Sequence, residues 1–103
     1  MPMTTMNDLR ISVVIPHLNQ PQMLARCLGS LRDGTRPPDE VIVVDNGSHA
    51  LPDVPANVTL LQENTPGPGP ARNLGVAHAT GDVIAFIDAD CLAHFDWLDA
   101  AAR

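Results

Sequence analysis

The fold is decided by the stretch Val83-Ile84-Ala85-Phe86-Ile87-Asp88-Ala89-Asp90, in which five apolar residues run into two carboxylates. An apolar run of this length is typical of a strand covered on both faces, as in parallel sheets, although a short helix shares the pattern. The preceding Thr80-Gly81-Asp82 favours the strand. Alternate residues of a strand share a face, with Cα atoms roughly 6.6 Å apart, so Asp88 and Asp90 could address one ligand. Two such carboxylates repel unless a divalent cation neutralises them, so the stretch predicts either a cation site or a solvated acidic turn.

Three further strands are expected, because apolar and β-branched residues recur in short runs along the chain. These runs lie at Leu9–Pro16, Glu40–Asp45 and Val58–Gln62. Pro16 has no backbone N–H to donate, so we expect it to end the first of these strands.

Helices are expected between the strands. The first should begin near Pro21 and end at Asp33-Gly34, where a glycine can close it. Its apolar stripe consists of Leu24, Cys27, Leu28 and Leu31. The alternating prolines and glycines of residues 66–70 are expected to break the chain, so the second helix is placed at Ala71–Ala79. A further helix starts at Phe95.

The alternation of strands and helices predicts an α/β fold with a mainly parallel, Rossmann-like sheet. In such sheets, ligands bind outside the carboxyl ends of the strands. Three of the predicted strands end in polar clusters, at Pro16–Asn19, Asp45–Ser48 and Asp88–Asp90. If the strands are parallel, all three clusters lie at one edge, and we expect them to share a ligand.

Composition narrows the class of protein further. At 103 residues the chain fits a single domain, in which residues 1–8 are expected to be a flexible N-terminus. The net charge of −6 and the lack of lysine leave no basic stripe, so nucleic acid is not expected as a partner. No apolar run is long enough to span a bilayer and no signal peptide is recognisable, so we expect a cytoplasmic protein. There, Cys27 and Cys91 are expected to be free thiols.

Other classes of protein share parts of this pattern. Gly67-Pro68-Gly69 suggests a dinucleotide-binding loop, but that loop needs N–H groups that prolines lack and a third glycine where Arg72 stands. A haloacid-dehalogenase-type phosphotransferase would use Asp88 as nucleophile, but it would also need a lysine, which this chain lacks. A P-loop is excluded because neither Gly-Lys-Ser nor Gly-Lys-Thr occurs. A noncatalytic nucleotide-binding or interaction module stays open.

Four ordered blocks of the sequence resemble the nucleotide-binding half of family 2 glycosyltransferases of GT-A fold. The blocks are Ile11–Pro16 with Asn19, Glu40–Ser48, Gly69–Gly75 and Gly81–Asp90. The resemblance extends to Leu98 and is specific for the fold and the donor site, not for the sugar or the acceptor. It implies a sheet with strand order 3-2-1-4. Residues 9–103 would then form a nucleotide-sugar-binding domain that is incomplete at its C-terminus.

The resemblance also implies a donor and a cofactor. The donor would be a nucleotide-diphosphate sugar, usually a UDP-sugar, and the cofactor Mn²⁺ or Mg²⁺. At the matching positions, Pro16 and Asn19 would line the nucleoside pocket and Asp45 would hydrogen-bond the base. Arg72 would lie beside the base or phosphates. Asp88 would approach the ribose, and Asp90 would bind the metal. The cation would act as a Lewis acid by neutralising the leaving diphosphate.

The sequence departs from the family pattern in two side chains and in extent. Leu18 stands where the family often has an aromatic residue, and Asn46 replaces the second acid of the common Asp-Asp-Gly-Ser. The family's acceptor half, with the carboxylate that would deprotonate the acceptor hydroxyl, normally lies beyond Arg103. We therefore expect no catalytic base in this chain, and donor binding without turnover.

In the full-length protein, the resemblance implies inverting transfer to a saccharide or lipid-linked saccharide. Such a protein could be peripheral at the inner membrane face. The strand at Val83–Ile87 would normally be flanked by later elements, so we also expect self-association through its exposed edge.

Overall fold

The structure, a computed structural model, describes residues 9–101 of the 103-residue chain. The expected flexibility of residues 1–8 lies outside the described residues. The elements follow one another as β1 (Ile11–His17), α1 (Pro21–Arg32), β2 (Glu40–Asp45), β3 (Val58–Gln62), α2 (Pro68–His78), β4 (Val83–Phe86) and α3 (Trp97–Ala101). This is the predicted order of strands and helices. Within residues 9–101, no helix is long and apolar enough to cross a membrane.

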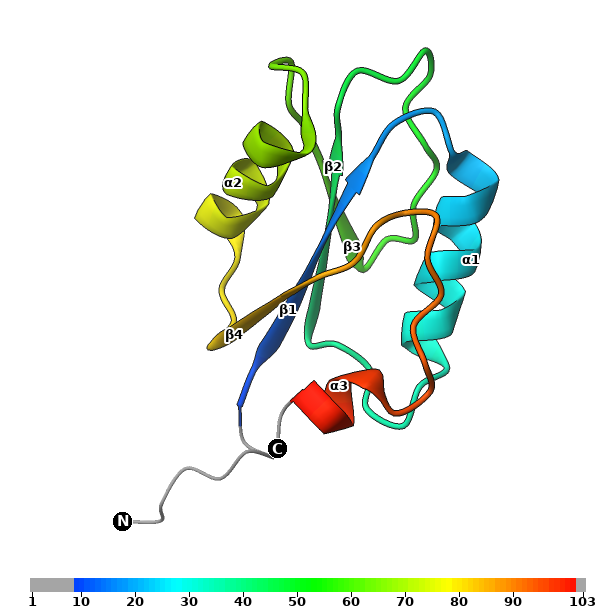
Figure 1. Cartoon of the computed structure of the whole chain (residues 1–103), viewed down its shortest axis with the longest axis vertical. Helices are drawn as coiled ribbons and strands as arrows, with labels where there is room; N and C mark the ends of the chain where they lie inside the picture. The colour runs from blue at the N-terminus through cyan, green and yellow to red at the C-terminus, as the bar shows by residue number, and fades with distance from the viewer. Residues whose placement is uncertain (1–8, 102–103) are drawn as a thin grey trace.

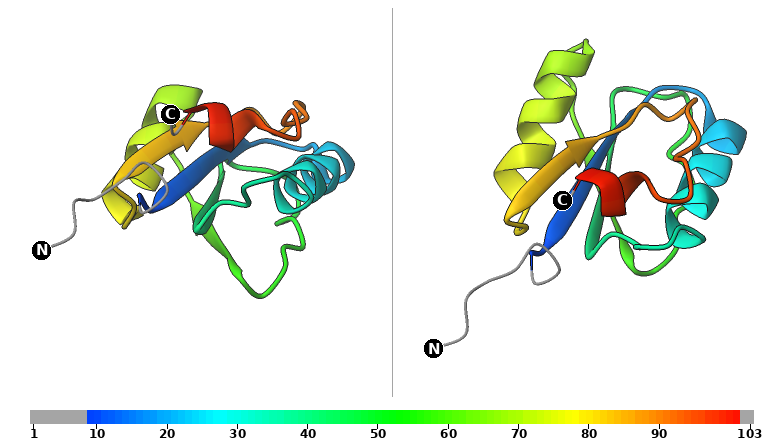
Figure 2. Two further views of the ribbon diagram at one scale, coloured as in Figure 1. Left: turned by 90° about the horizontal axis from the view of Figure 1, so that it is seen from below. Right: turned by 60° about the horizontal axis from the view of Figure 1, so that its bottom comes forward.

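The four strands form one parallel sheet in the order β3-β2-β1-β4 (Figure 1). Both the α/β class and the strand order 3-2-1-4 are thereby confirmed. Helices α1 and α2 lie on opposite sides of the sheet (Figure 2). Because the strands are parallel, the carboxyl ends of β1, β2 and β4 open at one edge, which we call the carboxyl edge.

Alternation of side chains along β1 builds a core on each face of the sheet. Val13 and Ile15 are fully buried and pack in one cluster with Leu24 of α1. Val14 lies on the opposite face, in a second cluster with Ala71 of α2. Every residue in the middle of β1 therefore contributes to one of the two cores, as expected for a central parallel strand.

The chain after β4 crosses to the side of α1 (Figures 1 and 2). There the backbone N–H of Ala93 donates to Ser30 Oγ at 2.9 Å, and the N–H of Thr35 donates to the carbonyl of Phe95 at 2.6 Å. Leu98 of α3 joins the core beneath α1. These contacts anchor the segment that follows the two carboxylates.

β4 is a half-buried edge strand, in which Val83 and Ala85 pack against one core and Ile84 against the other, so the predicted cover of both faces is only partial. It spans only Val83–Phe86, and Phe86 is 43% exposed. Pairing with β1 ends where the N–H of Ile87 donates to β1, so Asp88 and Asp90 lie beyond the strand. The strand alternation that we expected to align the two carboxylates does not apply. A turn brings them together instead.

Prolines lie within two elements that they were expected to interrupt. Pro16 belongs to β1. The backbone groups of Val14 face β4, and those of Pro16, two residues later, face the same way. At the level of Pro16, however, β4 has already ended. The missing N–H of Pro16 therefore removes no hydrogen bond between the strands. Helix α2 begins at Pro68, not at Ala71, because Pro68 and Pro70 occupy the first turn, where N–H groups have no intrahelical partner.

Candidate functional site

The carboxyl edge carries a cavity of about 360 Å³. Its wall includes Pro16, His17, Leu18, Asn46, Asp88 and Asp90. These residues come from the ends of β1, β2 and β4, so the predicted meeting of the three polar clusters at one edge is confirmed. Pro66, Gly67 and Pro68, where the chain enters α2, also line the cavity.

A second cavity, of about 290 Å³, lies between α1 and the connection from β2 to β3. Apolar residues such as Leu28, Val41 and Pro55 form much of its wall. Among the described residues, the acidic, histidine and cysteine side chains that could hold a metal ion cluster elsewhere, at the carboxyl edge. The chemistry of the chain therefore points to the cavity at the carboxyl edge.

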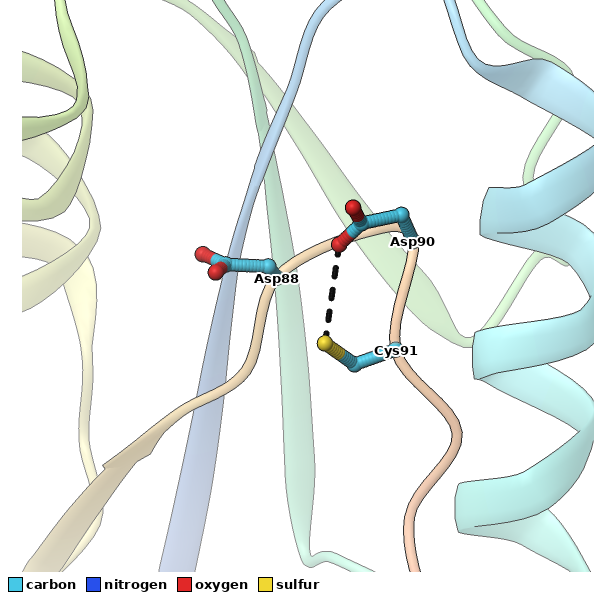
Figure 3. Close-up of side chains that lie close together, drawn as sticks. All are labelled: Asp88, Asp90 and Cys91. Carbon is cyan, nitrogen blue, oxygen red and sulfur yellow. Dashed lines mark hydrogen bonds between the residues drawn. The ribbon is translucent and has the colours of Figure 1, made fainter.

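Asp88, Asp90 and Cys91 form that cluster (Figure 3). One ligand atom from each side chain lies within 4.8 Å of the other two, and all three residues are exposed. The backbone N–H of Cys91 donates to the carbonyl of Asp88 at 3.0 Å, which closes the turn that gathers them. Carboxylate oxygens suit hard cations such as Mg²⁺ and Mn²⁺, so the two aspartates fit the metal that the sequence predicts.

Cys91 is a member of this cluster that the sequence reasoning missed. Its thiol donates to Asp90 Oδ1 at 3.5 Å. The hydrogen bond to Asp90 raises the pKa of the Cys91 thiol, and the negative charges of Asp90 and Asp88 act in the same direction. The position of Cys91 directly after Asp90 was a visible signal, but a cysteine next to a carboxylate is too common a pair to indicate a site.

Arg72 in α2 lies beside Asp88. Its Nη2 atom is 3.6 Å from Asp88 Oδ1, and the two side chains are 42% and 62% exposed. Figure 3 shows Asp88 directed towards the side of α2, whereas Asp90 and Cys91 face one another. The structure thus brings two of the predicted site residues together and leaves both side chains accessible.

Pro16 and Asn19 have different positions relative to the cavity. Pro16 lines it. Asn19 is not among the lining residues; its φ of 53° is in the left-handed region, and its side-chain oxygen accepts the N–H of His49 at 2.9 Å. Its own N–H donates to Ser48 Oγ at 2.8 Å. Asn19 therefore ties the loop after β1 to the loop after β2.

Asp45 is buried and fully occupied by hydrogen bonds. Its Oδ1 accepts from His17 Nδ1 at 2.9 Å and from Ser48 Oγ at 2.6 Å. Its Oδ2 accepts the backbone N–H groups of Ser48 and Gly47. Burial by itself raises the pKa of Asp45, but the bonds from Ser48 and His17 outweigh it and leave that pKa below its ordinary value. The contact between Asp45 and a base stays a prediction.

His17 and Asn46 hold the walls of the cavity. His17 is paired with Asp45 in the register of β1 and β2, which places both side chains on the face of α1. This pairing could be seen only once β1 was known to continue past Pro16. The Asn46 amide donates to the carbonyls of Glu63 and Thr65, and its oxygen accepts another N–H, so it fixes the loop between β3 and α2.

A parallel sheet in this order, with acids and an arginine at its carboxyl edge, defines an α/β domain suited to an anionic ligand and a cation. Residues 12–103 match the family model described as Glycosyl transferase family 2. The chain belongs to this family of enzymes, and its sheet has the arrangement of the GT-A glycosyltransferases. The dinucleotide-binding and phosphotransferase interpretations are therefore set aside.

Three known proteins illustrate the similarity. Glycosyltransferase AglE of Haloferax volcanii is 32% identical over 100 residues, which cover 86% of this chain and 33% of AglE. The structure of S. aureus TarS residues 1–349 in complex with UDP-GlcNAc is 28% identical, with a TM-score of 0.76, covering 90% of this chain and 30% of that one. Glucosyl-3-phosphoglycerate synthase of Mycobacterium tuberculosis, in complex with Mn²⁺, UDP and glucosyl-3-phosphoglycerate, is 25% identical, with a TM-score of 0.72, covering 96% of this chain and 43% of that one. The chain thus spans about a third of the length of AglE.

Proposed function

We propose that this chain is the donor-binding part of a glycosyltransferase and that it binds a UDP-sugar together with Mn²⁺ or Mg²⁺ at the carboxyl edge. The observation that carries the proposal is the exposed cluster of Asp88, Asp90 and Cys91, in which both aspartates line the cavity. Two structures similar to this chain contain UDP-GlcNAc, or UDP with Mn²⁺, and both match it over most of its length.

The proposal gives each accessible residue a part in donor binding. Asp90 holds the cation, which when bound would neutralise the diphosphate as it leaves the sugar. Asp88 approaches the ribose. The guanidinium of Arg72, which lies beside Asp88, donates its N–H groups to the phosphates. Pro16 packs against the nucleoside. Asp45 and Asn19 shape the same pocket from behind, through the loops that they hold.

Transfer to an acceptor is proposed for the whole protein. The reaction would be inverting, with a saccharide or lipid-linked saccharide as acceptor and a catalytic base outside this chain, so that the chain alone binds the donor without turnover. A cytoplasmic location, peripheral at the inner membrane face, stays a prediction.

Calorimetric titration with UDP, in Mn²⁺ and in EDTA, tests the proposal. We expect saturable binding that depends on the cation and is lost in Asp90→Asn, which keeps the size of the side chain and removes its charge. Arg72→Ala should weaken UDP binding in Mn²⁺ by about tenfold, because a charge-assisted contact to phosphate is lost. Asp53→Asn is the matched control, since Asp53 is an exposed acid that lines the second cavity.

Each outcome separates the proposal from its rivals. Cation-independent binding of UDP would favour a noncatalytic nucleotide-binding module. Equal binding by wild type and Asp90→Asn in Mn²⁺ would show that Asp90 does not hold the metal. The loss of binding in Asp53→Asn as well would mean that net charge, and not the cluster, governs affinity.

A further inference from the structure

A buried histidine at the end of β1 forms part of the wall of the cavity. The side chains of His17 and Asp45 are only 1% and 3% exposed. His17 Nδ1 lies 2.9 Å from Asp45 Oδ1. A buried imidazole beside a buried carboxylate is a costly arrangement unless every polar atom is satisfied, and here every one is.

The hydrogen bonds of His17 determine which nitrogen carries the proton. The backbone N–H of Gln20 lies 3.0 Å from His17 Nε2, and a backbone N–H can only donate. Nε2 must therefore be the bare acceptor nitrogen. Asp45 is an ionised acceptor, so the proton of a neutral imidazole resides on Nδ1 and is donated to Asp45. Both ring nitrogens are thus committed within the protein, and neither can bind a metal or transfer a proton to substrate.

These bonds hold one wall of the cavity. Gln20 precedes α1 and makes no side-chain cap, so the bond to His17 Nε2 satisfies one of the free N–H groups where the helix begins. On the other side, Asp45 accepts the hydroxyl of Ser48, and that hydroxyl oxygen accepts the N–H of Asn19. The backbone of Asn19 is left-handed, a conformation that asparagine adopts more readily than most residues other than glycine, and this bond helps to hold it there.

We propose that His17, as the Nδ1–H tautomer, is a positioning residue that fixes the loop of residues 17–20 as the nucleoside-facing wall of the donor cavity. Asp45 supports the same loop through its bonds to His17 and Ser48. The inference rests on the proposed donor site, because the wall matters to affinity only if a nucleotide occupies the cavity. It gives a function to a buried titratable pair that donor binding alone does not explain.

The tautomer is tested first, on the unmodified chain without ligand. Long-range ¹H–¹⁵N correlation spectra of ¹⁵N-labelled protein at neutral pH should show one imidazole with a protonated Nδ1 and a bare Nε2. His17→Asn should remove that signal, which assigns it. An Nε2–H tautomer or a doubly protonated ring at His17 would overturn the inference, whether or not UDP binds.

Affinity is tested next, with UDP in the presence of Mn²⁺ and with Mn²⁺ alone. His17→Ala should weaken UDP binding by about tenfold, because a charge-assisted hydrogen bond and the loop it holds are lost. Mn²⁺ affinity should stay unchanged, since Asp88 and Asp90 lie on a different loop. His17→Asn should recover part of the UDP affinity, because its amide nitrogen replaces Nδ1 as the donor to Asp45. His78→Ala, on the exposed surface of α2, is the control and should match wild type.

The outcomes that oppose the inference differ from those that oppose the donor site. If folded His17→Ala binds UDP as wild type does, or loses UDP and Mn²⁺ affinity alike, His17 is not a positioning residue for the nucleotide. If the unmodified chain fails to bind UDP, the proposed function falls and the positioning role falls with it, while the tautomer stands as a structural result.

Discussion

Aspartates at the carboxyl edge have opposite environments although they look alike in sequence. Asp45 is 2% exposed, and its carboxylate accepts hydrogen bonds from donors within the protein. Asp88 and Asp90 are exposed at the wall of the cavity, where their oxygens can accept an external cation. The difference arises because Asp45 still belongs to β2, beneath α1, whereas Asp88 and Asp90 lie past the end of β4.

The two cysteines should differ sharply in reactivity. Cys27 is buried in the core beneath α1, and burial raises the pKa of its thiol to about 11. Cys91 is exposed. Because only an accessible thiolate reacts readily, we expect a thiol reagent at pH 8 to label one cysteine in the native protein and both in denaturant. Mass spectrometry of digested protein identifies the site. Equal labelling rates in the native state would contradict this, and Cys91→Ser should lack the fast phase.

Glu40 should contribute to stability in a manner that depends on pH. Its Oε1 accepts the N–H of Thr80 at 2.8 Å and the hydroxyl of Ser12 at 2.7 Å, which links three chain segments. The bond from the Thr80 backbone is the main cause of a lowered Glu40 pKa, which burial opposes and the bond from Ser12 supports. A pKa that is lower in the folded state means stability present above the unfolded value of 4.5 and lost as pH falls through the folded value.

Replacement of Glu40 by Gln should therefore make the protein less sensitive to acid. We expect the free energy of unfolding, from urea titrations between about pH 3 and 6, to decline less steeply in Glu40→Gln than in wild type. The decline should persist in part, because Asp45 also has a lowered pKa. Glu63→Gln is the control. An acid limb of unchanged steepness in Glu40→Gln would show that this carboxylate is not protected by folding.

At the scale of elements, α2 packs close to the sheet because one of its glycines lacks a side chain. A Cβ atom added to Gly75 would overlap the Cγ1 atom of Val14, which is fully buried. Gly69 lies in the same helix with nothing within 4 Å of an added Cβ. The two glycines therefore provide a matched pair for measuring how much the close packing of α2 against the sheet contributes to the free energy of unfolding.

We expect Gly75→Ala to lower the free energy of unfolding by about 1–3 kcal/mol, because the rigid core around Val14 must shift. Gly69→Ala should be neutral or stabilising by up to about 1 kcal/mol, since alanine favours helix. Chemical denaturation of both variants checks this. A Gly75→Ala protein as stable as Gly69→Ala would mean that α2 can move away from the sheet at no cost.

The elements show which features could be predicted from the sequence. The parallel sheet and the common edge followed from apolar runs that end in polar residues, a pattern that each segment carries by itself. The extent of β1 past Pro16 and the burial of Asp45 depend on which strand lies alongside, and on where that neighbour stops. The sequence alone therefore placed His17 only in the polar cluster after the first strand. Its pairing with Asp45 became evident from the register of β1 and β2.

On the scale of the whole molecule, β4 forms one edge of the sheet, with β1 as its neighbour in the strand order. Phe86 on this strand is 43% exposed. An open edge with exposed apolar residues favours pairing with another copy. The predicted self-association therefore has a structural rationale.

Sedimentation velocity at increasing concentration tests this association. We expect the sedimentation coefficient of the 103-residue chain to rise with concentration. In Phe86→Lys the rise should be smaller, because a charge on the edge strand opposes pairing. A compact monomer at every concentration would contradict the prediction, and an equal rise in both proteins would place the contact elsewhere.

Donor binding as proposed depends on one coupling, between a cation and a nucleotide that share the carboxyl edge. The most direct measurement is the Mn²⁺ dissociation constant, obtained from the EPR signal of free Mn²⁺ with and without UDP. If Asp90 and the diphosphate hold the same ion, UDP should tighten Mn²⁺ binding by at least about tenfold, and Mn²⁺ should tighten UDP binding by the same factor. Identical Mn²⁺ affinities with and without UDP, while UDP binds equally well in EDTA, would contradict the central claim.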